Sequence, residues 1–436
     1  MFEKIGEKLS GMVKIPTVSG STDQYMIREY REYLEKTFPA LFGTAEKIPV
    51  EEALLLRLKG KGTNMLPVLF TGHMDVVAAE MSPGWEYPPF SGHMANGCIW
   101  GRGTQDMKGP QCALLSAADR LIMEDWIPDR DIWFYLSCDE ETGGETTKHA
   151  VQYLQEHKIR FATVFDEGGT ICENFMGLVK GPAAMFGIAE KGSLEYRFTA
   201  LSEGGHAANP PSNSAIVRLA ELIHEIESQD IFVRELSPGN RVMLRKMAEY
   251  TDDKMHDLLL CASEEYGEYP VLYDICEGAR ILLGATIAFT RVEGGTAFNV
   301  MPKKAVLTAN VRVSAVETEE AVTEKLKKIA DKHGVQCELV KGSDASRESS
   351  IEGPGYQAME ESVNRIYPGL PVIPFVLGGG TDSRYFEKVA DEAVRFSPMY
   401  AAPYQGRGVH AENESAFESA VIKAAECYYD LLKNNC

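Results

Sequence analysis

Short apolar segments alternate with longer amphipathic segments over the first part of the chain. Three of the short segments are rich in β-branched or aromatic residues and predict buried strands: MLPVLF (65–70), DIWFYL (131–136) and ATVF (162–165). Residues 109–125 predict a helix because apolar side chains recur there at helical spacing, at Ala113, Leu114, Ala117, Ala118 and Leu121. This alternation is typical of an α/β protein with crossover helices between buried strands.

Each predicted strand is followed at once by a polar cluster. The clusters are TGHMD (71–75), SCDEETGG (137–144) and DEGG (166–169). In open α/β sheets, ligands bind outside the carboxyl ends of the strands, so the three clusters predict one shared crevice.

The pattern changes after about Gly187. Two segments alternate like half-exposed strands, SLEYRFTAL (193–201) and MPKKAVLTANVRVS (301–314), and amphipathic helices are predicted at 213–229 and 319–334. The acidic helical segment 245–267 lies in an elaboration of this region, near 230–280. After about Asp344 the first pattern returns. We therefore expect a discontinuous catalytic domain, 1–187 and 347–436, split by a smaller inserted domain, 188–346.

Composition narrows the possible partners and the compartment. A chain of 436 residues favours two domains, and a formal net charge of −20 argues against nucleic acid or an anionic membrane surface as the main partner. The nine cysteines show no C-x-x-C spacing, which favours a reducing cytoplasm over a disulfide framework. The first 20 residues do not have the pattern of a signal peptide, and no segment approaches the ~20 apolar residues of a membrane span.

Histidines and carboxylates dominate the predicted crevice. Taken alone, His73 is more often a hydrogen-bonded structural histidine than a ligand, but buried acids after the strand WFYLS are costly without a nearby positive charge. A metal ion supplies that charge. Histidine and carboxylate ligands without cysteine suit catalytic zinc, manganese or cobalt. Two histidines with three carboxylates suffice for two metals, ~3.5–4 Å apart, that share one bridging carboxylate.

Eight ordered motifs carry a family resemblance. They are GHMDVV, WGRGTQDMKG, DEETGG, FDEGG, GGHAANP, TAFNVMP, GGGTDSRYF and GVHAENE. In this order they resemble the M20 metallopeptidases, a group of aminoacylases, dinuclear-zinc carboxypeptidases and dipeptidases, and look most like its carboxypeptidase S and N-acyl amino acid hydrolase branch. The resemblance implies an α/β catalytic domain, with a mixed sheet flanked by helices, and an inserted α+β, ferredoxin-like lid and dimerisation domain.

The resemblance also implies the metal ligands. His73 would bind one metal, Asp106 would bridge, and Glu141 and His410 would bind the other metal. The fifth ligand falls on FDEGG, where the family pattern assigns Glu167, with Asp166 as the alternative. Two divalent ions are implied, Zn²⁺ first, with Mn²⁺ or Co²⁺ as alternatives.

Other positions receive supporting roles. Asp75 would accept the second ring N–H of His73, or of a group beside it, and fix its orientation. Glu140 would act as general base, taking a proton from the attacking water and passing it to the departing amine. By resemblance, substrate binding falls on four residues: His206, reaching in from a partner subunit, Asn299, Arg312 and the backbone at Gly380. Outside the family context, His206 would be a loop histidine and Arg312 a surface arginine.

These observations predict a cytoplasmic, homodimeric metallohydrolase. It would cleave an amide bond next to a free carboxylate, in a short peptide or an N-acyl amino acid. One alternative is a biosynthetic N-acetyl or N-succinyl amino acid deacylase on the same scaffold, and another is a non-catalytic relative that only binds. The second alternative predicts that a metal ligand or the general base has been lost, whereas this sequence retains all five expected ligands and Glu140.

Overall fold

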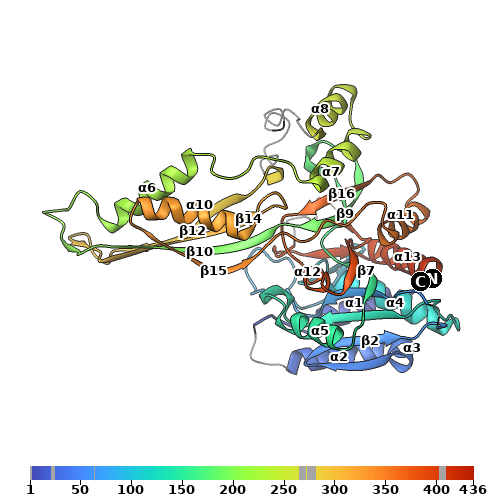
Figure 1. The fold of residues 1–436 in the computed structure, drawn as a ribbon. Coiled ribbons are helices and arrows are strands. Elements are labelled where there is room, and N and C mark those ends of the chain that lie inside the picture. Colours follow the sequence, from blue (N-terminus) through green and yellow to red (C-terminus); the bar gives the residue numbers. More distant parts are fainter. Residues whose placement is uncertain (1, 21–24, 63, 265–271, 273–280, 402–408) are drawn as a thin grey trace.

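Two sheets organise the computed structural model, which describes residues 2–20, 25–62, 64–264, 272, 281–401 and 409–436. A ten-stranded mixed sheet, the main sheet, has the order β1-β2-β6-β3-β7-β17-β9-β8-β18, with β16 paired to β9. A four-stranded antiparallel sheet, the insert sheet, has the order β12-β14-β10-β15 and projects away from it (Figure 1).

The strands of the main sheet come from both ends of the chain. Their bounds are β1 (Glu46–Val50), β2 (Ala53–Leu58), β3 (Val68–His73), β6 (Ile132–Ser137), β7 (Phe161–Asp166), β8 (Ile171–Glu173), β9 (Pro182–Glu190), β16 (Val372–Leu377), β17 (Ala390–Arg395) and β18 (Tyr400–Ala401). A three-stranded sheet, β19-β5-β4, lies beside it, with bounds β4 (His93–Ala95), β5 (Cys98–Trp100) and β19 (Ser415–Phe417). The sheet is mixed, as expected, because β3, β6, β7 and β17 pair in parallel while β1, β2 and β6 pair antiparallel.

Both faces of the main sheet are covered by helices. Along β6, Phe134 packs into the core with α4 and α13, while its neighbour Tyr135 faces the opposite core, with α5 and α12. Successive strand residues point to opposite faces, so a continuous apolar run such as IWFYL is what a doubly covered strand needs. The helices of this part are α1 (Ile5–Val13), α2 (Tyr25–Thr37), α3 (Pro39–Thr44), α4 (Lys108–Met123), η1 (Glu140–Thr142), α5 (Glu145–Glu156), η2 (Phe175–Gly177), α11 (Pro354–Ile366), α12 (Ser383–Phe386) and α13 (Glu418–Asn435).

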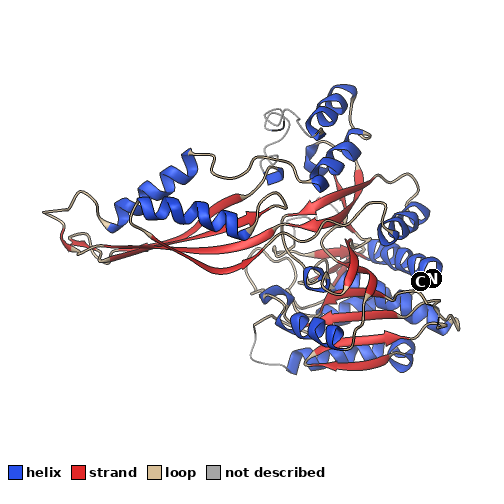
Figure 2. Cartoon of the chain, viewed as in Figure 1, coloured by secondary structure: helices blue, strands red, loops and turns tan. Residues whose placement is uncertain are grey.

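The insert sheet has helices on one face only (Figure 2). Its elements are β10 (Gly192–Leu201), α6 (Ala215–Ser228), β12 (Thr286–Gly294), β14 (Lys304–Val313), α10 (Glu319–Lys332) and β15 (Gln336–Ser343), and a small ladder joins β11 (Gly205–His206) to β13 (Val300–Met301). This βαββαβ order, with all pairs antiparallel, is the expected ferredoxin-like arrangement. Leu194 and Tyr196 face the helices, whereas Ser193 and Glu195 lie on the uncovered face, so the sequence alternates.

The elaboration is two helices rather than the single helical segment expected at 245–267. The first is α7 (Pro238–Ala248) and the second is α8 (Asp253–Ser263). Asp252 caps the start of α8, because its side chain accepts a hydrogen bond from the Met255 N–H at 3.1 Å. Helix α7 packs on β16 and α8 packs on α7, and the apolar cluster that they form includes Ile373 of β16 and Met185 of β9. Residues 265–271 and 273–280 of the elaboration lie outside the described residues.

The two ends of the chain meet on the main sheet. Helix α13 packs along α4, and the Phe2 and Tyr429 rings are 6.3 Å apart. In the described ranges, no helix is long and apolar enough to cross a membrane.

Candidate metal centre

The residues expected to hold metal lie where parallel strands of the main sheet end. His73 is the last residue of β3, Glu141 lies in η1 just after β6, and Glu167 follows β7. Asp106 precedes α4 by two residues, and His410 comes from the loop before β19. Because β3 lies between β6 and β7, the three strand ends converge on one crevice, as their polar clusters predicted.

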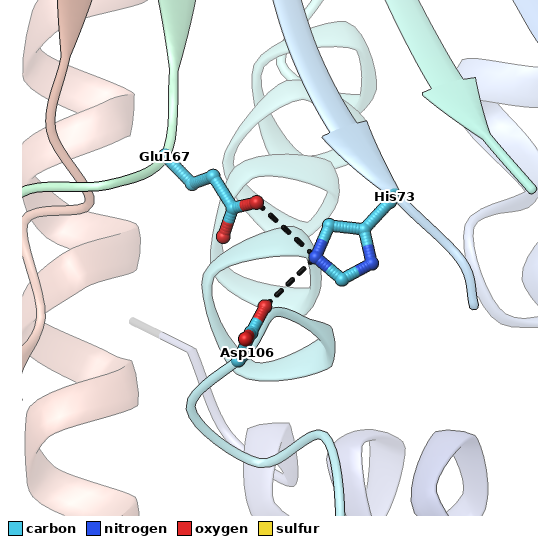
Figure 3. Close-up of side chains that lie close together, drawn as sticks. All are labelled: His73, Asp106 and Glu167. Atoms are coloured by element: carbon cyan, nitrogen blue, oxygen red, sulfur yellow. Dashed lines mark hydrogen bonds and ion pairs between the residues drawn. The ribbon is translucent and has the colours of Figure 1, made fainter. Parts of the chain in front are cut away.

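The first group joins His73, Asp106 and Glu167 (Figure 3). The Nε2 atom of His73 lies 2.8 Å from Oδ1 of Asp106 and 3.2 Å from Oε1 of Glu167. Its other ring nitrogen, Nδ1, is 2.8 Å from the main-chain carbonyl of Asp75. That contact fixes the ring so that Nε2 faces the two carboxylates.

The second group joins Asp106, Glu141 and His410. The Nε2 atom of His410 lies 3.1 Å from Oδ2 of Asp106 and 3.1 Å from Oε2 of Glu141. Asp106 therefore directs one carboxylate oxygen to each histidine, which is the arrangement that a bridging ligand requires.

The charge of the crevice fits divalent cations. Burial and neighbouring carboxylates raise the pKa of Glu140 to about 10 and that of Glu167 to about 8, although His73 acts in the opposite direction. These carboxylates crowd together with too little positive charge from the protein. Imidazole nitrogen and carboxylate oxygen are ligands that zinc and manganese accept, so the donor set fits such ions.

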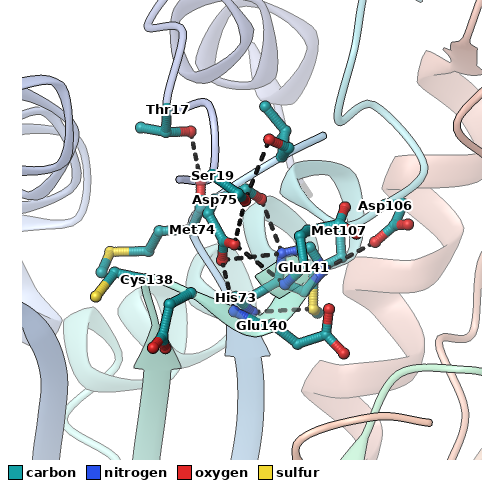
Figure 4. Close-up of polar contacts among 12 residues, drawn as sticks. Thr17, Ser19, His73, Met74, Asp75, Asp106, Met107, Cys138, Glu140 and Glu141 are labelled. Atoms are coloured by element: carbon teal, nitrogen blue, oxygen red, sulfur yellow. Dashed lines mark hydrogen bonds and ion pairs between the residues drawn. The ribbon is translucent and has the colours of Figure 1, made fainter. Parts of the chain in front are cut away.

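Asp75 positions the Glu140–Glu141 turn (Figure 4). Its fully buried carboxylate accepts hydrogen bonds from the backbone N–H groups of Glu140 at 3.3 Å and Glu141 at 3.2 Å, and from the Ser19 hydroxyl at 2.5 Å. The carboxylate is 3.5 Å from the His73 ring, farther than the main-chain carbonyl. The side chain of Asp75 thus acts on Glu140 and on the second group more directly than on His73.

A buried ion pair, which the sequence did not single out, supports Asp106 and His410. Arg102 donates to the Glu414 carboxylate at 2.6 Å and to the His410 main-chain carbonyl at 3.0 Å. Glu414 also accepts from the backbone N–H groups of Gln105 and Asp106, at 2.8 and 3.3 Å. Both residues lie within motifs of the family resemblance, but only the fold shows that they face one another.

Of the two acids in FDEGG, only Glu167 reaches the first group. Asp166 turns the other way, and its Oδ2 accepts a hydrogen bond from the Ser383 N–H at 2.8 Å. Neighbouring residues at the end of an extended strand point to opposite sides, which explains the division.

A cavity of about 380 Å³ opens beside the two groups. One part of its wall is polar and includes Glu140 and the glycine loop, which we define as Gly378, Gly379 and Gly380. The other part is largely apolar and consists of Pro110, Phe375, Leu377, Met399 and Val409. A Cβ atom built on Gly378 or Gly379 would meet no described atom within 4 Å, so this backbone is open to a ligand.

The expected substrate-binding residues separate along the insert sheet. Arg312 lies opposite Ser193 at the end of β10 nearest the main sheet. His206 lies beyond the other end of β10, which is ten residues and therefore about 30 Å long. The main-chain carbonyl of Asn299 accepts from Ala207, so Asn299 is at the His206 end. Within one chain, the structure does not bring His206 and Asn299 to the crevice.

Comparison with known proteins gives a consistent picture. A family model described as Peptidase family M20/M25/M40 matches residues 69–434. The human N-fatty-acyl-amino acid synthase/hydrolase PM20D1 is 28% identical over 440 residues, covering 98% of this chain and 87% of the relative. Carboxypeptidase S of Saccharomyces cerevisiae is 26% identical over 485 residues, covering 98% and 83%. The crystal structure of the M20 family metallo-carboxypeptidase Sso-CP2 from Sulfolobus solfataricus shares the fold, with a TM-score of 0.74, 21% identity and 99% of each chain covered.

Proposed function

The chain belongs to peptidase family M20/M25/M40, and on that premise we propose that it hydrolyses the amide bond next to a free carboxylate in N-acyl amino acids or short peptides, with two divalent cations bound. The observation that carries the proposal is Asp106, whose two carboxylate oxygens each face a different histidine.

In this proposal His73 and Glu167 would hold one cation, Glu141 and His410 would hold the other, and Asp106 would contribute to both sites. Bound there, two such ions would lower the pKa of water and stabilise developing negative charge on the substrate carbonyl oxygen. Glu140 takes the proton of the attacking water and delivers it to the leaving amine nitrogen. Asp75 keeps Glu140 in place through the backbone bond at 3.3 Å. We propose Zn²⁺ first, with Mn²⁺ or Co²⁺ as alternatives.

The apolar wall beside the centre supports an acyl amino acid with an apolar acyl group. Phe375, Leu377 and Met399 offer an acyl chain a surface that excludes water. The names of two relatives, an N-fatty-acyl-amino acid hydrolase and a carboxypeptidase, agree with this substrate class. Arg312 would bind the free carboxylate bidentately.

We also propose the division into catalytic domain, 1–187 and 347–436, and insert domain, 188–346, with a homodimer formed through the insert. Apolar side chains exposed toward the far part of the insert support this pairing: Leu201, Ile216, Val292, Phe298 and Val300. In such a dimer His206 of the partner subunit would reach the crevice and donate to the developing oxyanion. The eight described cysteines are free thiols, in keeping with the cytoplasm.

The test compares metal-stripped protein with protein reloaded with zinc or manganese. Its panel contains N-acetyl and long-chain N-acyl amino acids and dipeptides, each paired with its carboxyl-amidated analogue. We expect cleavage that requires metal, disappears on amidation and is fastest for an apolar acyl chain. Two bound metals without cleavage of any compound would refute the substrate class, and full activity of the metal-free protein would refute the metal chemistry.

A further inference from the structure

Two arginines from different parts of the chain come near one another where the insert sheet meets the main sheet. Arg312 comes from β14, and Arg384 comes from α12, just after the glycine loop. Burial and the nearby Arg384 guanidinium lower the pKa of Arg312, while Glu195 acts in the opposite direction. Two adjacent cations in a chain of net charge −20 indicate a site for an anion.

The register of the insert sheet fixes this juxtaposition. Arg312 pairs with Ser193, and Ser193 pairs with Ser343, so the three side chains form a row across one face of the sheet. Neighbouring strands are about 4.8 Å apart, which places Ser343 about 10 Å from Arg312 in the backbone. The Nη1 atom of Arg384 donates to the Ser343 hydroxyl at 3.3 Å. The long side chain of Arg312 can therefore approach the guanidinium of Arg384 over Ser193.

Both arginines have donors to offer a ligand. Arg384 is held by Glu190, 3.4 Å from its Nε, and by the Lys191 carbonyl, 3.1 Å from its Nη2. With the Ser343 contact, these partners use three of five N–H groups and leave two. Among the described residues, no carboxylate lies within ion-pair distance of Arg312, whose guanidinium is half-buried.

Arg384 lines a cavity beside the candidate metal centre, and Ser193, the strand partner of Arg312, lines it too. A cavity of about 310 Å³ is lined by Arg384, Ser193, Ser343, Gly380 and Glu140, the proposed base. Gly380 and Glu140 also line the cavity of the metal centre. A Cβ atom on Gly380 would meet Nη1 of Arg384 at 2.8 Å, so the third glycine of the loop makes room for this guanidinium.

We propose that Arg384 is a substrate-binding residue that holds the free carboxylate of the substrate together with Arg312, one guanidinium from each side of the junction. The inference rests on the proposed function and deepens it. It also fixes the orientation of the substrate: the amino acid half lies in the arginine cavity, and the acyl half lies along Phe375 and Leu377.

The test measures binding rather than turnover. Zinc-loaded Glu140→Gln protein is titrated calorimetrically with N-decanoyl-L-phenylalanine and with its carboxamide. We expect Arg384→Lys to weaken binding of the acid by about tenfold or more, because lysine lacks the planar fork, and to leave the carboxamide affinity unchanged. Arg197→Lys is the matched control, because Arg197 lies on the same face of β10 as Ser193 and forms an ion pair with Glu338 away from the cavity. It should change neither affinity.

Further outcomes separate the two proposals. Gly380→Ala, which keeps the arginine but displaces its guanidinium, should reduce the preference for the acid as well, and it decides the matter if Arg384→Lys does not fold. A preference for the acid that survives both substitutions would overturn the inference. If the wild-type protein hydrolyses nothing on the panel but Arg384→Lys still abolishes the preference for the acid, the arginine site stands and the hydrolytic function fails.

Discussion

Replacing Asp75 with asparagine should slow hydrolysis by about 10–100-fold without unfolding the protein. The carboxylate accepts one hydrogen bond on Oδ1, from Glu140 N–H, and two on Oδ2, from Glu141 N–H and the Ser19 hydroxyl. Asparagine keeps the shape but has only one acceptor oxygen. Its amide NH₂ must then face a backbone N–H, and leaving such a buried donor unpaired costs about 1–3 kcal/mol. Because about 1.4 kcal/mol corresponds to a tenfold change, this free-energy cost corresponds to the expected loss of about 10–100-fold in hydrolysis rate.

Asp75→Asn should weaken one of the two metal-binding groups and leave the other unchanged. The His73 ring is fixed by the main-chain carbonyl of residue 75, which the substitution leaves unchanged. Whichever way the amide turns, either the Glu140 N–H or the Glu141 N–H loses its partner and the turn that carries both residues loosens. The group of Glu141 and His410 should therefore bind metal more weakly, whereas the group of His73 should not.

Two measurements check this. Steady-state kinetics on an N-acyl amino acid gives kcat, and elemental analysis after dialysis against a weak chelator gives metals per chain, with anomalous diffraction showing which site is filled. Ser19→Ala is the graded control, because it removes one hydroxyl donor and leaves both backbone bonds. It should cost less than about fivefold. A kcat within twofold of wild type for Asp75→Asn, or selective loss of the metal at His73, would refute the reasoning.

Other substitutions test the remaining parts of the site. Glu140→Gln should lower kcat by about 10²–10⁴-fold while both metals stay bound, and near-normal turnover with two metals would rule out Glu140 as the base. Asp106→Asn should impair binding at both metal positions, whereas His410→Ala should impair one, as titration with zinc would show. Arg102→Met leaves the Glu414 carboxylate buried without its partner and should destabilise the protein by about 3–5 kcal/mol, measured by urea unfolding, and an unchanged midpoint would contradict this.

The sequence predicts the strands because a doubly covered strand needs a continuous apolar run. It places their ends less well: β3 continues through Thr71 and Gly72 to His73, beyond the apolar run. Gly72 packs against Met107, where a Cβ would meet the methionine Cε at 2.7 Å. That contact joins residues far apart in the sequence, so the pattern of apolar residues within a single strand cannot predict it.

Some features of the candidate site can likewise be predicted from the sequence, and others only from the folded chain. The polar clusters after the strands predict His73 and Glu141 as neighbours, the family resemblance adds Asp106 and His410, and the structure brings the four together. The choice between Asp166 and Glu167 depends on which side each faces at the end of β7, a matter of one residue in register. The distance between His206 and Arg312 likewise depends on the length and pairing of β10, which only the folded sheet reveals.

The residues of the candidate metal centre are far apart in the sequence, so the ribosome makes them at different times. His73, Asp106 and Glu167 leave the ribosome early, but His410 follows only after the whole insert sheet has been made. At about 5–20 residues per second, the synthesis of the 243 residues from Glu167 to His410 takes roughly 12–50 s. During it a nascent chain holds only part of the candidate metal centre and an incomplete sheet edge. If the proposed centre binds two cations, its complete loading can therefore follow only after His410 has been made.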